Sequence, residues 1–296
     1  MIEDSKQENH RLTNAKRTRR LGNPDEGCPI DSTALWGWDE PRKPNNPWSH
    51  LTMKRAWRFV VPIGFLFIVI CPLCESQESI CIEEWFRQAK GLLDKTESYT
   101  AVFHKQERIK GALKPRETIE LKFKKPFMVY MRWMEGPGKG REVYYVPGWN
   151  DNRMLVREPA LGGTVTLNLH PQSALAMRGS RHPITEVGLD RLVNLFEDYF
   201  RKGRGSSEFE LRRGPKEILF DRWVLPVEMV FPKDRRNGSY CYRSIISFDL
   251  QKKIPIRVRN FDWDDRLIED YGYEALQLRA GLTDADFDPD RLKRRF

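Results

Sequence analysis

Alternation of apolar and polar residues with a period of two dominates the chain after residue 97. The segment TIELKFKK places Ile119, Leu121 and Phe123 on one side and charged residues on the other, which is the pattern of a half-buried strand. Similar runs recur about every ten residues, separated by turns such as GPGKG and PGWNDN. Because this spacing leaves no room for crossover helices, it predicts antiparallel meanders and not a βαβ sheet.

Two segments show helical spacing instead. In residues 80–98 the apolar residues recur every three or four positions, which predicts one buried helix face. The same spacing over residues 186–203 predicts a second helix, with Thr185 as its N-cap and Gly203 at its end. We therefore expect a mostly antiparallel α+β fold: a curved half-barrel sheet of about ten or eleven strands, with two or three helices covering its concave side.

One predicted strand, FMVYMRWM at 127–134, is apolar on both of its faces. Met131 and Trp133 point to one side, and Tyr130 points to the other. Such a strand is either core between two layers or the wall of a cavity. Methionine beside aromatic residues suits a cavity for flexible apolar ligands, and two or three helices leave the inside of a curved sheet partly unfilled.

A long connection, LHPQSALAMRGSRHPITEVGLDRL, joins the first half of the sheet to the second helix. It is rich in small and apolar residues ahead of two arginines, and a connection of this length either packs as a plug or moves as a lid. The candidate cavity or lid residues are Phe103, Phe123, Tyr130, Trp133 and Tyr145 on the strands, and Met177, Arg181 and His182 in the connection.

A basic cluster followed by an apolar run begins at Met53. The apolar run 59–70 and the polar CESQES after it predict an export signal that is cut after Ser76. The run is short for a membrane span, and a retained inner-membrane anchor is the alternative. An exported chain would lie in the periplasm.

The residues before this signal have balanced charge and little aliphatic content, so they cannot bury enough apolar surface to fold. The sequence thus predicts a disordered leader or mis-annotated start over 1–52, a signal peptide over 53–76, and one exported domain over 77–296.

The formal net charge of the 296-residue chain is +9. Its basic residues lie in pairs between the apolar positions of strands, which favours solvated strand faces over a nucleic-acid groove. We expect no nucleic-acid partner. A mild attraction to anionic lipid headgroups stays open.

Candidate chemistry is sparse in the predicted domain. His104, His170 and His182 have no metal-ligand spacing, and no GxSxG motif accompanies a serine, so we expect no catalytic residue, metal or cofactor. Cys81 and Cys241 would be the two cysteines left after signal cleavage, and they would either form one disulfide or stay reduced.

Several runs resemble a family of uncharacterised exported bacterial proteins in the LolA-like group: YTAVFHKQERIKG, KFKKPFMVYMRW, GKGREVYYVPG, GSRHPIT and LRAGLTDADFDP. The resemblance covers about residues 80–290. It is weaker to LolA itself, the outer-membrane lipoprotein carrier. It implies an incomplete β-barrel closed by helices, with an apolar cavity that shields acyl chains from water. LolA holds its lid through an arginine of an early strand, for which Arg116 and Arg132 are the candidates here.

The leading hypothesis is a periplasmic, non-enzymatic carrier or chaperone for a lipid or lipoprotein acyl chain, with envelope membrane proteins as possible further partners. The periplasmic sensors RseB and MucB share the implied fold, so a sensor or regulatory interaction module is the alternative. A third hypothesis, an enzyme acting on an envelope polymer, requires Arg181 and His182 to share one cleft with a carboxylate.

Overall fold

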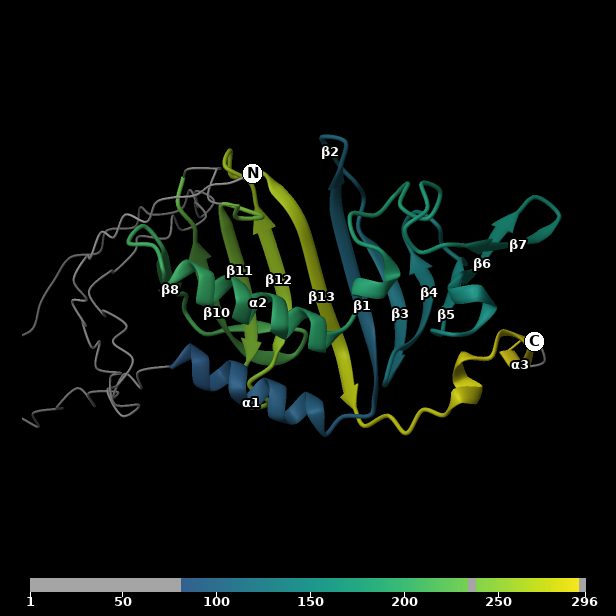
Figure 1. Ribbon diagram of the computed structural model, residues 1–296, viewed down its shortest axis with the longest axis horizontal. Coiled ribbons are helices and arrows are strands. Elements are labelled where there is room, and N and C mark those ends of the chain that lie inside the picture. Colours follow the sequence, from purple (N-terminus) through teal and green to yellow (C-terminus); the bar gives the residue numbers. More distant parts are fainter. Residues whose placement is uncertain (1–80, 234–237, 293–296) are drawn as a thin grey trace, which may run out of the picture. The chain divides into compact units, whose positions relative to one another are not determined.

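The computed structural model describes residues 81–233 and 238–292 (Figure 1). Its strands are β1 (Ser98–Ile109), β2 (Ala112–Leu113), β3 (Glu117–Lys124), β4 (Met128–Glu135), β5 (Glu142–Tyr145), β6 (Met154–Ala160), β7 (Gly163–Leu169), β8 (Glu210–Arg213), β9 (Glu217–Leu219), β10 (Arg222–Val230), β11 (Arg243–Asp249), β12 (Pro255–Phe261) and β13 (Leu267–Leu278). The helices are α1 (Ile82–Asp94), α2 (Leu189–Gly203) and the short α3 (Pro289–Leu292), and the 3-10 turns are η1 (Asn150–Asn152), η2 (Ile184–Glu186) and η4 (Asp284–Phe287). The predicted leader and signal peptide lie outside the described residues.

All of these strands belong to one 13-stranded antiparallel sheet in the order β7-β6-β5-β4-β3-β1-β13-β12-β11-β10-β8. The short strands β2 and β9 lie off this path and pair with β1 and β10. The predicted α+β fold is confirmed, and its ten or eleven strands correspond to the main path. The sheet is unclosed, with β7 and β8 at its two edges.

Strand β1 lies in the middle of the sheet and joins its two halves. It pairs with β3 on one side and with β13 on the other, so that Phe103 lies opposite both Ile119 and Tyr273. The strands from β3 to β7 follow one another along the chain on the first side. Strands β13 to β10 run back in reverse order on the second side (Figure 1).

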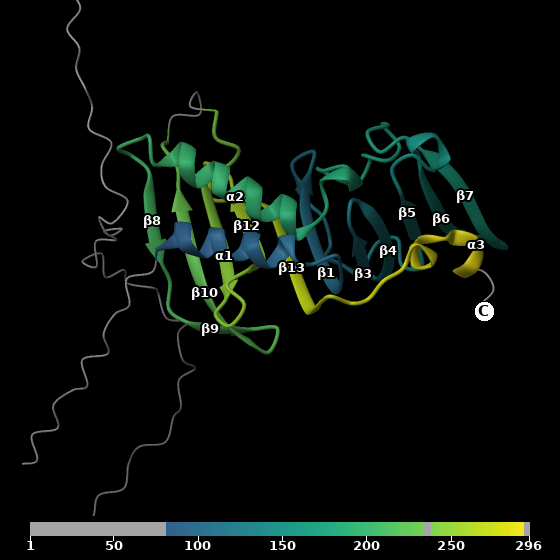
Figure 2. The same cartoon turned by 60° about the horizontal axis from the view of Figure 1, so that its bottom comes forward.

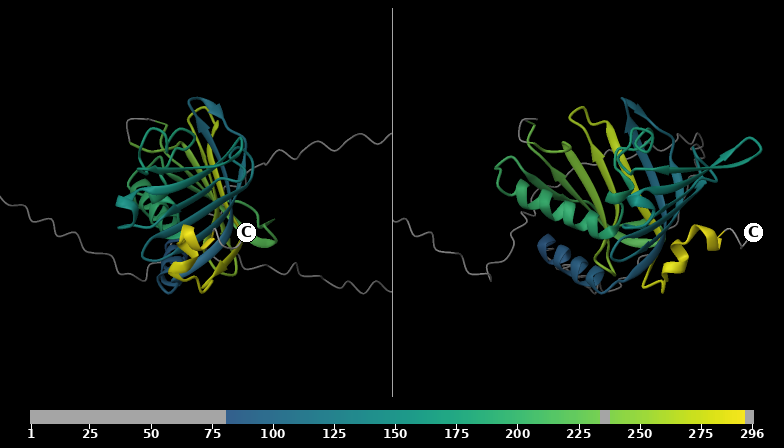
Figure 3. Two further views of the ribbon diagram at one scale, coloured as in Figure 1. Left: turned by 90° about the vertical axis from the view of Figure 1, so that its right-hand side faces the viewer. Right: turned by 45° about the vertical axis from the view of Figure 1, so that its right-hand side comes forward.

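Helices α1 and α2 lie side by side on the concave face, over the half that contains β10 to β13 (Figures 2 and 3). The ring of Phe86 on α1 is 6.0 Å from that of Phe200 on α2 and 5.8 Å from that of Phe248 on β11. Burying one such side chain stabilises the fold by about 1.5–3 kcal/mol, which explains why the apolar stripe of each helix faces the sheet. Among the described residues, no helix combines the length and apolar character needed to span a membrane.

The start of α2 differs from the expectation. Thr185 lies in the turn η2, and α2 begins at Leu189, directly after Gly188, whose φ is +130°. The Leu189 N–H donates to the hydroxyl oxygen of Tyr99 at 3.0 Å. A residue distant in sequence therefore binds one of the free N–H groups of the first turn, and no local N-cap side chain does so. The predicted end at Gly203 is confirmed.

The segment after β13 crosses to the opposite half of the sheet (Figure 2). There Phe287 packs against Tyr130 of β4 and Tyr144 of β5. The Arg157 guanidinium of β6 donates to the backbone oxygen of Pro289 at 2.9 Å. The second apolar face of β4 is thus covered by the C-terminal segment, so the two-faced strand is both core and cavity wall.

Candidate functional site

A cavity of about 740 Å³ lies on the concave face, between the sheet, α2 and the connection from β7 to α2. Its volume falls in the range of ~300–1,000 Å³ that is common for small-ligand sites. The apolar residues that line it from the strands and α2 include Phe103, Met131, Trp133, Val143, Met154, Val156, Leu167, Leu169, Leu192, Leu195 and Phe196.

Strand register explains this apolar wall. Met131 of β4 is the pairing partner of Val143 of β5, which pairs with Val156 of β6, which pairs with Leu167 of β7. Directly paired residues point to the same face of a sheet. These four side chains therefore form a continuous apolar row across four strands, which we call the apolar row.

The connection covers the cavity without filling it. It runs from residue 170 to 188, and we call it the cover. Leu175, Ile184 and Val187 are among its residues that line the cavity. The cover thus forms one wall of the space whose other wall is the sheet, so any ligand that fills the cavity contacts both.

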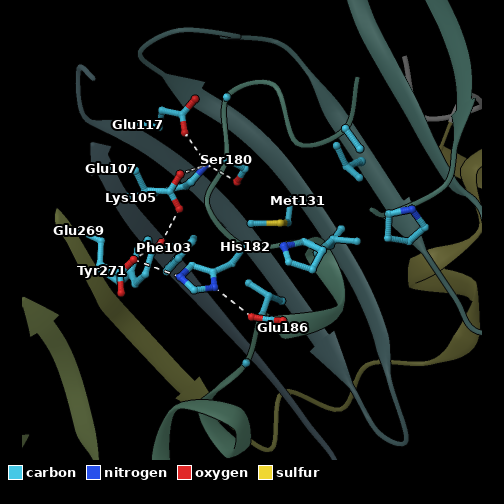
Figure 4. Close-up of a pocket in the computed structure, with 18 of the residues that line it drawn as sticks. Phe103, Lys105, Glu107, Glu117, Met131, Ser180, His182, Glu186, Glu269 and Tyr271 are labelled. Atoms are coloured by element: carbon cyan, nitrogen blue, oxygen red, sulfur yellow. Dashed lines mark hydrogen bonds and ion pairs between the residues drawn. The ribbon is translucent and has the colours of Figure 1, made fainter. Parts of the chain in front are cut away.

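Buried charged residues fasten the cover to β1 (Figure 4). The Lys105 ammonium of β1 donates to the Ser180 hydroxyl at 2.9 Å, and it lies 3.3 Å from the carboxylate of Glu107 and 3.4 Å from that of Glu117. The backbone N–H of Arg181 donates to Glu107 at 3.0 Å. Both contacts fix the cover at residues 180 and 181.

A second group of contacts fastens the cover to β13. The Glu269 carboxylate, with a side chain only 4% exposed, accepts from His182 at 3.1 Å and from Tyr240 at 2.8 Å. The Arg181 guanidinium lies 3.3 Å from the same carboxylate. The other ring nitrogen of His182 is 2.9 Å from Glu186 of η2.

The hydroxyl of Tyr271 links the two groups. It donates to Glu107 and lies 3.4 Å from an oxygen of Glu269. The residues Lys105, Glu107, Arg181, His182, Glu269 and Tyr271 together form what we call the latch. Buried ionic groups of this kind are stable only when they are paired, so the latch residues tie the cover to β1 and β13.

The pKa shifts agree with a charged pair between His182 and Glu269. Burial alone would lower the pKa of His182, but the hydrogen bonds and charges of Glu269 and Glu186 outweigh it and raise that pKa. Burial would raise the pKa of Glu269, but hydrogen bonds from His182, Tyr240 and Asn260 outweigh it and lower that pKa. Both shifts favour an imidazolium paired with a carboxylate.

Three of the eight predicted residues line the cavity: Phe103, Trp133 and His182. Tyr130 lies on the opposite face of the sheet, in contact with Phe287, and is not part of the cavity lining. Met177 and Arg181 belong to the cover but are not part of the cavity lining, although Arg181 contacts Glu269, which is.

The other two predicted aromatic residues are core. Phe123 stacks on Tyr99 with 5.0 Å between ring centroids and packs against Gly188. Tyr145 is buried and its ring lies 5.9 Å from that of Phe127. Neither ring belongs to the cavity lining. A role in ligand binding stays a prediction for each of the eight residues.

The latch carboxylates were missed from the sequence. Glu107 follows Phe103 and Lys105 at alternate positions of β1, and Glu269 precedes Tyr271 and Tyr273 in the same way on β13. Alternation alone places all of them on the inner face. A charged residue at an inner strand position was therefore the sequence signal that could have identified Glu107 and Glu269.

Cys81 and Cys241 are free thiols, so the possible disulfide is not formed. Burial, with the nearby charge of Glu269, raises the pKa of Cys241 to about 12. Among residues 81–233 and 238–292, no group of three or more potential ligand side chains is arranged to hold a metal ion.

The enzyme hypothesis requires Arg181 and His182 to share one cleft with a carboxylate. This requirement is met in part, because both residues contact Glu269. Both ring nitrogens of His182, however, lie against carboxylates. Its imidazole therefore presents no free nitrogen to the cavity as a general base. The arrangement favours a fastening role for these residues over an acid–base role.

The candidate lid arginines lie on the other face of the sheet. Arg116 donates to Asp270 at 3.3 Å, and Asp270 alternates with the inward Glu269 and Tyr271. Arg132 is exposed and alternates with the inward Met131 and Trp133. The cover is held by the latch instead.

Residues 96–296 match the family described as "Protein of unknown function (DUF1571)". The chain belongs to this family. This match confirms the prediction that the chain belongs to an uncharacterised family. A search of curated proteins gives no match.

Solved structures with a related fold include proteins of the LolA superfamily. The LolA superfamily protein from Nitrosomonas europaea has 11% identity and a TM-score of 0.29, over 72% of this chain and 99% of that chain. Lipoprotein LppX from Mycobacterium tuberculosis has 8% identity and a TM-score of 0.41, over 70% and 98%. The Pseudomonas aeruginosa MucA/MucB complex has 14% identity and a TM-score of 0.38, over 70% and 60%. A likeness this distant assigns no ligand to the chain.

Proposed function

We propose that this DUF1571 protein is an exported, non-enzymatic carrier or chaperone that holds a lipid or lipoprotein acyl chain in its cavity. The observation that carries the proposal is the apolar row of Met131, Val143, Val156 and Leu167 beneath the cover. Removing an acyl chain from water is worth about 0.8 kcal/mol for each CH₂ group. Such burial supplies binding energy without any catalytic residue.

The cover gives the proposed carrier a way to load and release. Residues of the cover line the cavity, so the ligand enters when the cover moves away from β1 and β13. That movement separates the charged groups of the latch. The separation costs free energy unless water or a partner replaces the lost contacts. A partner protein that binds the latch residues would therefore promote release, which is the point at which carrier and regulatory roles meet.

The first test is native mass spectrometry of protein purified after expression of the full chain, followed by organic extraction of bound molecules. A carrier should retain an acyl compound, or take up added phospholipid or lipopeptide. A mass without ligand, and no uptake of either probe, would refute the carrier function. It would leave the sensor or regulatory module as the remaining hypothesis.

The second test separates the cavity from the rest of the sheet. Met131→Lys and Leu167→Lys place a charge in the apolar row from two different strands, and we expect each to lower acyl-chain uptake at least tenfold, since a buried unpaired charge costs more than about 1.4 kcal/mol. Arg132→Gln is the control, because Arg132 lies on the same strand as Met131 but points to the opposite face of the sheet, where its own side chain is exposed. Circular dichroism confirms that each variant is folded. Unchanged uptake in both lysine variants would remove the cavity assignment.

A further inference from the structure

The two edges of the sheet differ in their chemistry. The β8 edge is four residues long, and Glu210, Arg212 and Arg213 give it three charged side chains. The β7 edge is seven residues long, GTVTLNL, and carries no charged residue and no proline. Natural proteins protect exposed edge strands with charges, proline, bulges or a short length, because such edges pair with other strands. The β8 edge is protected in this way and the β7 edge is not.

The free side of β7 is open to solvent in the part of the chain that the structure describes. Among the described residues, the only strand beside β7 is β6 (Figure 1). The pairing of the two strands runs without a bulge from Met154 opposite Leu169 to Ala160 opposite Gly163. Every residue of β7 is exposed or half-buried, and Val165 is 47% exposed. Within the described residues, β7 therefore presents a bulge-free, uncharged edge to which another strand can pair.

We infer that β7 pairs with β7 of a second copy of this chain, so that the sheets of two molecules join edge to edge across a two-fold axis. The argument for a second copy is self-complementarity. Thr166 is the middle residue of β7. In an antiparallel pair centred on it, Thr166 of one copy faces Thr166 of the other. Val165 then faces Leu167 of the other copy, and Thr164 faces Asn168 of the other copy. No pair of like charges opposes this arrangement, Val165 and Leu167 meet as an apolar pair, and Leu169 faces Gly163.

The joined sheet would also extend the proposed cavity. Leu167 and Leu169 point inward from β7 and line the cavity of their own molecule. Pairing places Val165 of the second copy opposite Leu167, and Gly163 of the second copy opposite Leu169, on the same face. The open side of each cavity then borders an apolar strand in place of water. This inference stands independently of the ligand that the cavity holds.

The test is the molar mass in solution, measured by size-exclusion chromatography with light scattering across a wide range of protein concentrations. Wild-type protein should form dimers. The double variant Thr164→Lys/Thr166→Lys should be monomeric. The two lysines at position 166 would face each other across the pair, and the lysine at position 164 adds a further charge to the edge. These side chains point away from the cavity, and circular dichroism serves as the check that the variant is folded.

Charge reversal makes the test specific to this edge. Thr164→Glu/Thr166→Glu should also be monomeric, and an equimolar mixture of the lysine and glutamate variants should restore a dimer of intermediate charge. Arg213→Glu on the β8 edge is the matched control and should remain dimeric. A wild-type monomer at every concentration, or a lysine variant that stays dimeric, would overturn the inference.

Discussion

At the scale of single residues, the latch shows how buried charge fastens a long connection to the sheet. Glu269 is only 4% exposed at its side chain and contacts both His182 and Arg181 of the cover. Its charge is stable there because two cations and several hydrogen-bond donors surround it. The contacts of His182 and Arg181 with β13 therefore depend on one carboxylate, that of Glu269.

Replacing this carboxylate tests the latch. Glu269→Gln keeps the shape but removes the buried negative charge beside Arg181 and leaves His182 with Glu186 alone, and we expect the free energy of unfolding to fall by about 3 kcal/mol. Denaturant titration measures the change. Glu274→Gln is the matched control, because Glu274 also contacts a histidine, His104 at 2.6 Å, but its side chain is 43% exposed. That control should lose less than about 1 kcal/mol, and an equal loss in both variants would contradict the latch.

The latch also predicts a pH dependence. The folded-state pKa of His182 is raised above its ordinary value of 6.5, so its contribution is complete below that pH and is lost as pH rises through the folded pKa. The pKa of Glu269 is lowered from 4.5, so its contribution is complete above that pH and is lost as pH falls through its folded pKa. Both contributions are thus complete between these two ordinary values.

His182→Gln removes the first of these contributions. We expect the stability difference between wild type and His182→Gln to be largest near pH 5.5 and to shrink as pH rises, because the protonated ring is the form that the folded state favours. Denaturant titrations at a series of pH values measure the trend. His170→Gln is the control, since His170 is exposed and makes only a local contact with Gln172. A difference that grows with pH would reverse the assigned sign.

At the scale of elements, the start of α2 depends on close packing against β1 and β3. Gly188 has a φ of +130°, and a Cβ at this position would lie 3.2 Å from the Phe123 ring and 3.4 Å from the Tyr99 hydroxyl. The cover ends here and the helix begins, so this glycine sets the direction in which the chain leaves the cavity. Its backbone conformation is one that residues with a Cβ rarely adopt.

Gly188→Ala should therefore lower the free energy of unfolding by about 1–3 kcal/mol through backbone strain and crowding. Gly91→Ala is the matched control, because Gly91 lies inside α1 with no atom within 4 Å of its added Cβ. That change should raise stability by about 0.5–1 kcal/mol, since alanine is the better helix former. Thermal unfolding of both variants gives the comparison, and a neutral Gly188→Ala would show that the helix start tolerates a Cβ.

Sequence patterns predicted which segments form helices and strands better than they predicted where those segments begin and end. Period-two and helical spacing located the strands and both long helices, because they depend on burial along one face. The Thr185 cap was wrong because the group that binds the helix N-terminus, Tyr99, lies 90 residues away in sequence. The position of Tyr130 was ambiguous for a similar reason. Which face of β4 meets the cavity depends on where Phe287 of the C-terminal segment packs.

At the scale of the whole molecule, the pairing of β1 with β13 organises everything else. It joins the half that carries the apolar row to the half that carries α1 and α2. The latch crosses the same boundary, since Glu107 lies on β1 and Glu269 on β13, its pairing partner. No local pattern predicts this pairing, because strands that alternate alike can be ordered in many ways. The cavity and the latch could therefore not be assembled from sequence alone.

The pairing of β1 with β13 also sets the order of events when the chain is made. Strand β1 ends at Ile109, and its partner begins at Leu267. At the usual rates of synthesis, the ribosome takes on the order of ten seconds to reach that partner. During this interval β1 has an open edge in the middle of its future sheet, and closing so distant a contact is itself slow. The nascent chain is thus kept from its final fold until almost all of it has been translated.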